Sequence, residues 1–404
     1  MSARPLAGVK VLDLSRVLAG PWCTQLLADL GAEVVKVEKP GAGDDTRHWG
    51  PPWHEHDGER VAAYFLAANR GKKSVALDFS TEEGAAVVRS MAAEADVLVE
   101  NFRVGGLERY GLDADSLRAA NPRLIYASVT GFGQDGPYKD RAGYDYMIQA
   151  MGGMMSVTGQ PDGSPGGEPL KVGVAIADIF TGMYTASAIL AALHERDATG
   201  EGATIDMALF DTQLAVLANQ ASNAMVSGCD PTRMGNAHPN IVPYQPFTAS
   251  DRPLVIAVGN DGQFAKLAAL CGHPEWAEDE RFATNAARVA NRETIVAKVQ
   301  AVIADEPADT WMERLLEAGI PAGPINSIGE APSDTQAMHR GAKQVRGAGA
   351  LGAVPMVGSP IRLDGARVDA DLAPPALGEH SDAVLADYLS ADELAALKKS
   401  GIVG

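Results

Sequence analysis

The N-terminal part of the chain alternates short apolar segments with helical ones, and this order restricts the fold more than any other feature. Val9 to Leu14 is a predicted strand, Pro21 to Leu30 a helix with Pro in its first turn, and Val34 to Glu38 a second strand. Gly31 follows the helix, where glycine commonly ends one. A strand, a helix and a strand in this order predict a β-α-β unit with parallel strands.

The same alternation continues along the chain. Ser74 to Asp78 is a predicted strand, and Ser80-Thr-Glu-Glu83 has the spacing of a capping box at the start of the next helix. Strands are also predicted at Val97 to Glu100 and at Arg123 to Thr130, and the glycine-rich loop 131–137 follows the second. A parallel sheet is the natural outcome, and ligands bind at the carboxyl ends of such strands.

A chain of 404 residues can form more than one domain. We expect residues 1–205 to form the N-terminal part of a large domain, followed by a linker helix within residues 206–230. Residues 231–325 combine strand and helix patterns and predict a small α+β domain. Residues 326–404 are expected to form a linker and then to return to the large domain.

Composition excludes several classes of partner. The formal charge of -18 argues against nucleic acid and anionic membranes, which bind clustered Lys and Arg. Cys23, Cys229 and Cys271 are scattered and form no CxxC pair, as is typical of a reducing cytoplasm. The N-terminus leads directly into a strand, so neither a signal peptide nor a membrane span is expected. We therefore expect a cytoplasmic protein.

An apolar segment over Val172 to Ala177 stops at Asp178, where a helical pattern of apolar residues begins. The pattern continues to Leu193 and Gly200 ends it, so Asp178 is predicted to be the N-cap. Capping alone would explain an Asp at this position. Exposed N–H groups and the helix dipole would also favour the ionised form that a carboxylate nucleophile needs. Such N–H groups are also candidates to stabilise an oxyanion.

Three other kinds of site have weaker support. The first turn, Ser15 to Pro21, lacks the GxGxxG pattern, so NAD binding is disfavoured although Glu38 ends the second strand. His54 and His56 lie in a predicted surface loop without a third ligand, so no metal is expected. No Gly-x-Ser-x-Gly elbow follows a strand, which disfavours a serine hydrolase.

Cationic side chains recur near predicted strand ends and loops. This placement suits a ligand that carries phosphate groups, although each cation taken singly also fits a solvated surface. The residues are Arg16, Lys39, Arg47, Lys72, Lys73, Arg103 and Arg109.

Seven sequence motifs, distributed in order over almost the whole chain, carry a resemblance to a known family. They are Asp13-Leu-Ser-Arg-Val-Leu-Ala-Gly-Pro21, Gly31-Ala-Glu-Val-Val-Lys-Val-Glu-Lys-Pro-Gly41, Glu100-Asn-Phe102, Gly131-Phe-Gly-Gln-Asp-Gly-Pro137, Gly143-Tyr-Asp145, Ala177-Asp178 with Gly182-Met183, and Leu377-Gly-Glu-His380. Together they resemble the class III CoA-transferases, the CaiB/BaiF family.

The resemblance implies a Rossmann-like large domain, built from N- and C-terminal segments, and a small domain between them. It also implies an interlocked homodimer. The family nucleophile, the Asp of an Asp-x-x-x-Gly-Met motif, maps onto Asp178. The CoA contacts that carry over are Leu18, Ala19, Lys39, Leu77, Asp78, Phe79, Ser80, Asn101, Phe102, Arg103, Arg109, Ala142, Gly143, Tyr144 and Asp145.

The implied reaction transfers CoA from an acyl-CoA to a carboxylic acid through an aspartyl anhydride and an aspartyl-CoA thioester. CoA is a substrate, and neither a metal nor a redox cofactor is expected. Related α-methylacyl-CoA racemases pair the Asp with a His where this chain has Tyr144. Racemisation needs a second acid/base, for which Tyr is poorly suited. A racemase-like isomerase and a non-catalytic CoA-binding protein remain as alternatives.

The segment Met234 to Pro246 resembles the family loop that covers the active site, and Gly235, Asn236 and His238 are candidate substrate residues. Its sequence is closer to members that exchange CoA among dicarboxylates than to those that act on oxalate. Arg16 and Arg47 are candidates to hold the distal carboxylate of a diacid.

Overall fold

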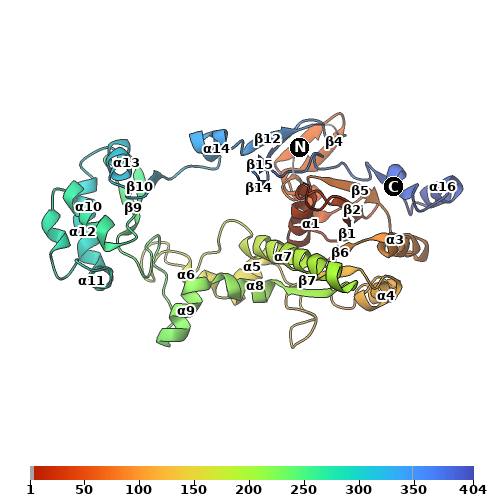
Figure 1. Ribbon diagram of the computed structural model, residues 1–404, viewed down its shortest axis with the longest axis horizontal. Coiled ribbons are helices and arrows are strands. Elements are labelled where there is room, and N and C mark those ends of the chain that lie inside the picture. Colours follow the sequence, from red (N-terminus) through yellow and green to blue (C-terminus); the bar gives the residue numbers. More distant parts are fainter. Residues whose placement is uncertain (1–3, 348) are drawn as a thin grey trace. The chain divides into compact units, whose positions relative to one another are not determined.

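The computed structural model describes residues 4–347 and 349–404, which form two compact units (Figure 1). The first unit comprises the N-terminal residues as far as Met154, together with Lys171–Ser222 and Thr335–Gly404. The second comprises Met155–Leu170 and Asn223–Asp334. Segments from both ends of the chain therefore build the first unit.

A six-stranded parallel sheet forms the centre of the first unit, in the order β5-β2-β1-β6-β7-β8. The strands are β1 (Lys10–Asp13), β2 (Glu33–Glu38), β5 (Lys72–Ala76), β6 (Val97–Glu100), β7 (Ile125–Thr130) and β8 (Thr204–Ala208). The chain proceeds outward from β1 in one direction and then from β6 in the other, so ligands are expected at the carboxyl ends of these two strands. The predicted mixed α/β fold with a parallel sheet is confirmed.

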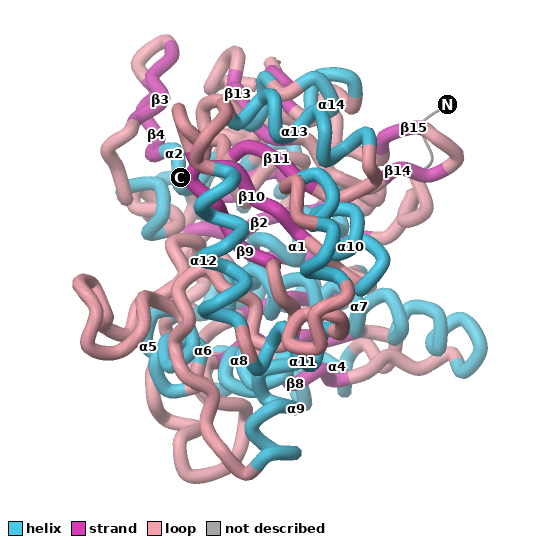
Figure 2. The backbone as a smooth tube through the Cα atoms, turned by 90° about the vertical axis from the view of Figure 1, so that its left-hand side faces the viewer, coloured by secondary structure: helices cyan, strands magenta, loops and turns pink. Residues whose placement is uncertain are grey.

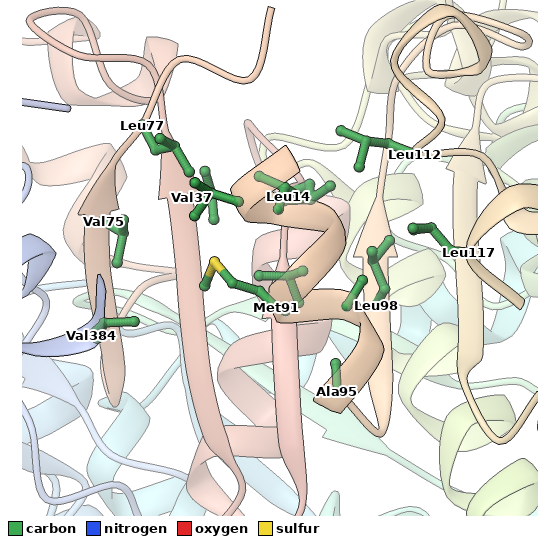
Figure 3. Close-up of a cluster of buried hydrophobic side chains, with 14 of the residues drawn as sticks. Leu14, Val37, Val75, Leu77, Met91, Ala95, Leu98, Leu112, Leu117 and Val384 are labelled. Atoms are coloured by element: carbon green, nitrogen blue, oxygen red, sulfur yellow. The ribbon is translucent and has the colours of Figure 1, made fainter. Parts of the chain in front are cut away.

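Helices cover both faces of this sheet because alternate strand residues point to opposite faces. Leu12 of β1 packs in a cluster with helix α3 (Glu82–Glu94), and Figure 3 shows Met91 of α3 beside Val37 and Leu98. Val11, the neighbour of Leu12, belongs to the cluster on the other face, with α1 (Ala19–Asp29) and α7 (Ile176–Thr199).

The remaining elements of the first unit lie around the sheet and its edges. They are β3 (Trp53–His56), β4 (Glu59–Ala62), α2 (Ala63–Leu66), α4 (Ala114–Ala120), α5 (Asp145–Met151), α8 (Leu209–Val216), α14 (Thr335–His339), β12 (Lys343–Arg346), β13 (Val354–Val357), β14 (Arg362–Leu363), β15 (Ala366–Arg367), α15 (Ser381–Leu385) and α16 (Ala391–Lys399). The C-terminal segment pairs with the end of β5, where Gly404 N–H donates to Ala76 O at 3.0 Å.

The second unit is built on a three-stranded antiparallel sheet in the order β11-β10-β9. Its core includes Phe247, Phe264 and Trp311. Figure 2 shows α10, α12 and α13 beside the three strands. The elements are β9 (Tyr244–Thr248), β10 (Pro253–Ala257), α10 (Asp261–Leu270), α11 (Asn285–Ala290), α12 (Arg292–Ile303), α13 (Ala308–Glu317) and β11 (Ala322–Pro324). Helices α6 (Met154–Val157) and α9 (Ala218–Ser227) span the boundaries of the two units.

Three local predictions are wrong. Thr81, not Ser80, caps α3, because the Thr81 hydroxyl accepts the N–H of Gly84 at 3.1 Å. The segment of His54 and His56 is the first strand of a hairpin, β3 paired with β4, rather than a loop. The helix after β8 is interrupted before Ala218, whose φ of 47° is incompatible with a continuous helix.

Helix α7 is the one described helix whose length and apolar character would allow it to cross a membrane. In this structure it is a core helix of the first unit, with Ile189 and Leu193 buried beside the sheet and α1. Its N-terminus carries Asp178.

Candidate active site

Asp178 is the third residue of α7, not its cap. Ala175 occupies the N-cap position and contributes no side-chain hydrogen bond. The prediction that Asp178 caps this helix is therefore wrong. Its side chain is free for another role because a different carboxylate binds the helix end.

That carboxylate belongs to Asp145, the first residue of α5. Asp145 Oδ1 accepts the N–H of Ala177 at 2.8 Å and, more weakly, the N–H of Asp178 at 3.5 Å. Asp145 Oδ2 accepts Nε2 of Gln149 at 2.7 Å. The amide oxygen of Gln149 in turn accepts the N–H of Val172 at 2.8 Å. These contacts connect α5 with the first turn of α7 and with the segment that precedes it.

The flanking N–H groups of α7 also have partners. Ile176 N–H donates to Val174 O at 2.8 Å, and Ile179 N–H donates to Ala175 O at 3.1 Å. Three of the four N–H groups that a helix normally leaves without partners are therefore engaged, whereas the Ile179 bond is an ordinary intrahelical one. The N–H groups of Ile176, Ala177 and Asp178 are therefore not free to stabilise an oxyanion.

Asp178 as a residue is only 9% exposed. Within the described residues its carboxylate accepts no hydrogen bond. Burial, and secondarily the nearby charge of Asp145, raise the pKa of Asp178 to about 7. The expectation that the helix end keeps Asp178 readily ionised is therefore wrong. Tyr64 of α2 lies in the same environment, and burial, followed by the charges of Asp178 and Asp145, raises the pKa of its hydroxyl to about 12.

Asp178 lines a cavity of about 450 Å³ at the carboxyl ends of β1, β6 and β7. Many of the residues predicted from the sequence line it together, although they come from distant segments. They are Arg16, Leu18, Ala19, Asn101, Phe102, Arg103, Arg109, Ala142, Gly143, Tyr144 and Asp178. The position agrees with the expectation for a parallel sheet of this strand order.

Five cationic side chains line this cavity in a chain of net charge -18: Arg16, Arg103, Arg109, Lys139 and Arg141. Arg16 forms an exposed ion pair with Asp45 at 3.2 Å. Among the described residues, the other four have no ion pair with a carboxylate. Sequence reasoning missed Lys139 and Arg141, although both lie in the loop after β7 that ends in the predicted Gly143-Tyr-Asp145 motif.

The turn that brings Arg16 to Ala19 to the cavity is held in an uncommon conformation. Val17 has a φ of 72°, which is unfavourable for a β-branched residue. Its N–H donates to both carboxylate oxygens of Asp44 at 3.2 Å. Asp44 also pairs with the fully buried Lys36 at 3.0 Å, and Lys36 Nζ donates to Ser15 O at 2.6 Å. A buried charge network therefore fixes this turn.

Two close backbone contacts require glycine at the site. A Cβ atom on Gly143 would lie 2.2 Å from the Cα of Gly131, so the loop after β7 folds back on itself there. A Cβ atom on Gly182 would lie 2.6 Å from the carbonyl oxygen of Ala19. Gly182 is one turn after Asp178 on α7, so the same helix face points toward the start of α1. The glycine of the Asp-x-x-x-Gly-Met motif thus allows α7 to approach α1.

The other predicted CoA residues do not line this cavity: Lys39, Leu77, Asp78, Phe79, Ser80 and Asp145. Phe79 is close, since its ring packs edge-on against Phe102 with centroids 5.7 Å apart. Leu77 is fully buried in the hydrophobic core, so its side chain is unavailable to a ligand. Gly235, Asn236 and His238 belong to the second unit.

Arg47 does not fit its predicted role as a carboxylate-binding residue. It is buried and forms a bidentate pair with Glu38, with Nε–Oε1 and Nη2–Oε2 distances of 2.8 Å. Its guanidinium also lies 3.7 Å from the centroid of the Phe65 ring. The expectation is corrected accordingly: Arg47 stabilises the loop after β2.

In the described part of the chain, no group of three His, Cys, Asp or Glu side chains is arranged to hold a metal ion. His54 instead hydrogen-bonds Leu351 O at 2.7 Å.

The sequence model of CoA-transferase family III matches residues 6–381. The chain belongs to this family. It is similar to the succinate–glutarate CoA-transferase of Agrobacterium fabrum, with 52% identity over 390 residues, which cover 95% of both chains. It is 38% identical to the human succinyl-CoA:glutarate CoA-transferase over 402 residues, covering 99% of this chain and 90% of the relative.

A solved structure supports the same assignment. A CaiB/BaiF family protein from Brucella suis superposes with a TM-score of 0.83 at 54% identity, covering 95% of this chain and 99% of the other. The predicted membership of the class III CoA-transferases is confirmed, and with it the prediction that this chain is an enzyme.

Proposed function

We propose that this family III enzyme transfers CoA between dicarboxylic acids, with Asp178 as the nucleophile. The observation that carries this proposal is a nearly buried carboxylate with no hydrogen-bond partner of its own, in a cavity lined by cations. The cations suit the phosphate groups of CoA. The names of the relatives support succinate and glutarate as the acid pair.

The reaction follows from the chemistry of a carboxylate and a thioester. An oxygen of Asp178 attacks the thioester carbonyl, the C–S bond breaks, and CoA leaves as a thiolate. The thiolate attacks the Asp178 carbonyl of the mixed anhydride and releases the donor acid as a carboxylate. The acceptor carboxylate then attacks the aspartyl-CoA thioester, and the thiolate that leaves takes the acceptor's acyl group from the new anhydride. Asp178 is regenerated as a carboxylate.

The cavity cations belong to the CoA side of this proposal. Arg103, Arg109, Lys139 and Arg141 are proposed to bind the phosphates, while Leu18, Ala19 and Gly143 contact the pantetheine and thioester. Lys39 and the segment 78–80 remain proposed CoA contacts at the neighbouring strand ends, and Leu77 only through its backbone. For the acceptor acid we propose Arg16, which is half-exposed at the cavity. Within the second unit, Gly235, Asn236 and His238 stay the substrate residues that the family resemblance proposes.

We further propose the domain division and the interlocked homodimer that the resemblance implies. Apolar side chains with high exposure support a self-association surface, since Val226 is 89% and Ile328 95% exposed in the single chain. Native mass spectrometry should give twice the chain mass, and a monomer at micromolar concentration would contradict the dimer. The proposed cellular location is the cytoplasm, where the free thiols Cys23, Cys229 and Cys271 would stay reduced.

The test is a matrix of acyl-CoA donors and carboxylate acceptors, followed by mass spectrometry. We expect transfer between succinyl-CoA and glutarate, and a CoA adduct on the peptide that contains Asp178. Asp178→Ala should abolish both, whereas Asp197→Ala, at an exposed position of the same helix, should change neither. Adduct formation in Asp178→Ala would overturn the nucleophile. Rapid exchange of the α-proton in deuterated buffer, without any acceptor acid, would indicate racemisation instead.

A further inference from the structure

The end of α7 that carries Asp178 is held by a second carboxylate. Asp145 accepts hydrogen bonds on both oxygens, from Ala177 N–H on one and from Gln149 Nε2 on the other. Both contacts are of the kind that a carboxylate oxygen accepts. The acidic side chain that raises the pKa of Asp178, after burial, therefore lies at the helix end that carries the nucleophile.

We propose that Asp145, held by Gln149, is a positioning residue that orients Asp178 and keeps its carboxylate reactive by occupying the amide donors of α7. This inference rests on the proposed function. It gives Asp145 a different role from the CoA contact expected from the sequence. Asp145 does not line the cavity, whereas Asp178 does.

The hydrogen bonds show which amide donors of α7 are occupied and so cannot bind the Asp178 carboxylate. The first four N–H groups of α7 bind Asp145 or carbonyl oxygens, so none of them is available to the Asp178 carboxylate. An anion at a helix N-terminus is normally stabilised by those groups. At this helix end the stabilisation goes to Asp145 instead.

The remaining charged and titratable groups around Asp178 come from four places. Helix α2 contributes Tyr64, whose hydroxyl is neutral at physiological pH. The turn after β1 contributes Arg16, and the loops after β6 and β7 contribute the other cavity cations. Asp145 is the charged group that shifts the pKa of Asp178, and it shifts that pKa upward, in the same direction as burial.

This arrangement favours acylation of Asp178. The Asp178 anion is close to another anion and lacks donors, and both unfavourable features are relieved when the carboxylate becomes part of a neutral anhydride or thioester. The negative charge passes to the CoA thiolate, which leaves into the cation-lined cavity. Asp145 therefore raises the energy of the free nucleophile more than that of its acylated forms.

The test uses three variants and the pH dependence of a single turnover, read as formation of the CoA adduct. Asp145→Asn removes the charge but keeps an oxygen for Ala177 N–H. In this variant the new amide N–H₂ group faces the N–H₂ group of Gln149, so two donors meet. We therefore also use the double variant Asp145→Asn/Gln149→Glu, in which residue 149 accepts. The double variant restores every hydrogen bond and moves the charge one turn away. Asp113→Asn, at the half-buried cap of α4, is the matched control.

In the wild type, adduct formation should increase with pH through about 7, as Asp178 loses its proton. Both variants that remove the charge from position 145 should show this rise at lower pH, by about one pH unit, with a maximum rate lower by ~10-fold or more. The Asp113→Asn control should follow the wild-type profile.

An unchanged pH profile in Asp145→Asn and in the double variant would overturn the inference. So would a raised KM for acyl-CoA with a normal pH profile, which would indicate a CoA contact. Thermal melts of each variant separate loss of folding from loss of rate. If the wild type forms no adduct with any donor, the proposed function fails, independently of what the variants do.

Discussion

Asp178 illustrates how a functional residue can be unfavourable for folding. Its pKa rises from an ordinary value of 3.8 to about 7 in the folded chain, so the folded state binds more protons than the unfolded state between these values. Stability must therefore fall as pH increases from about 4 to about 7. At about 1.4 kcal/mol for each pKa unit, this increase in the pKa of Asp178 lowers the free energy of unfolding by roughly 4 kcal/mol.

Asp178→Asn should relieve this unfavourable interaction, because a neutral amide of the same shape replaces a buried anion. We expect the variant to be inactive yet more stable than the wild type at pH 8, by up to about 4 kcal/mol. At pH 5, about one pH unit above the ordinary pKa of 3.8, the difference should fall to roughly 1.6 kcal/mol. Denaturant unfolding at the two pH values measures both effects.

Asp13→Asn provides a control of opposite sign. Asp13 is fully buried and pairs with Lys72 at 3.0 Å, and although burial opposes ionisation, the charges of Lys72 and Lys36 lower its pKa to about 2. Removing that charge should destabilise the protein at both pH values, by about 3 kcal/mol or more. Equal behaviour of Asp178→Asn at pH 5 and pH 8 would mean that Asp178 is not a strained anion.

At the scale of elements, the position of Asp178 depends on how closely α7 approaches α1. The Gly182 position leaves no room for a Cβ atom, because the nearest atom is the backbone oxygen of Ala19 and cannot rotate away. The same contact holds Ala19, which lines the cavity, next to the helix of the nucleophile. A change in the packing of α7 against α1 would therefore also change the geometry of the site.

Gly182→Ala should therefore separate the helices and lower both stability and activity. An Ala in a helix is intrinsically more favourable than Gly by about 1 kcal/mol, so a net loss of 1–3 kcal/mol, about that expected for overpacking, would come from the clash. Gly262→Ala in α10 is the matched control, since its nearest neighbour is 3.4 Å away in a side chain. We expect the control to be neutral or stabilising in thermal melts, and a stable, active Gly182→Ala enzyme would contradict the packing argument.

The same elements show what the sequence can predict. Helices that are buried on one face show a period of about 3.6 residues, whereas the strands at Val97 and Ile125 are buried on both faces and are visible as short continuous apolar runs. The cap of α7 was not predictable from nearby residues, because Asp145 precedes the helix by 31 positions and reaches it only in the folded chain. The ion pair of Arg47 with Glu38 likewise forms only through tertiary packing.

At the scale of the whole molecule, the net charge of -18 and the anionic ligand pose a problem that local cations must solve. The body of the protein repels a CoA thioester at long range, whereas four cavity cations without carboxylate partners attract it at short range. Because the short-range contacts are less screened by salt, they decide binding once the ligand is at the cavity. For CoA binding, the position of a cation should therefore matter far more than its contribution to the net charge.

Lys139→Gln and Lys399→Gln test this point, because they are the same substitution with the same effect on net charge. Lys139 lines the cavity, while Lys399 is the exposed last residue of α16. We expect Lys139→Gln to raise the KM for acyl-CoA several-fold and to leave the KM for the acceptor acid unchanged, since only CoA carries phosphates. Lys399→Gln should match the wild type in both constants. Equal increases in the two variants would mean that net charge, rather than the cavity, governs CoA binding, and an increase in the KM of the acceptor alone would move Lys139 to the carboxylate side of the site.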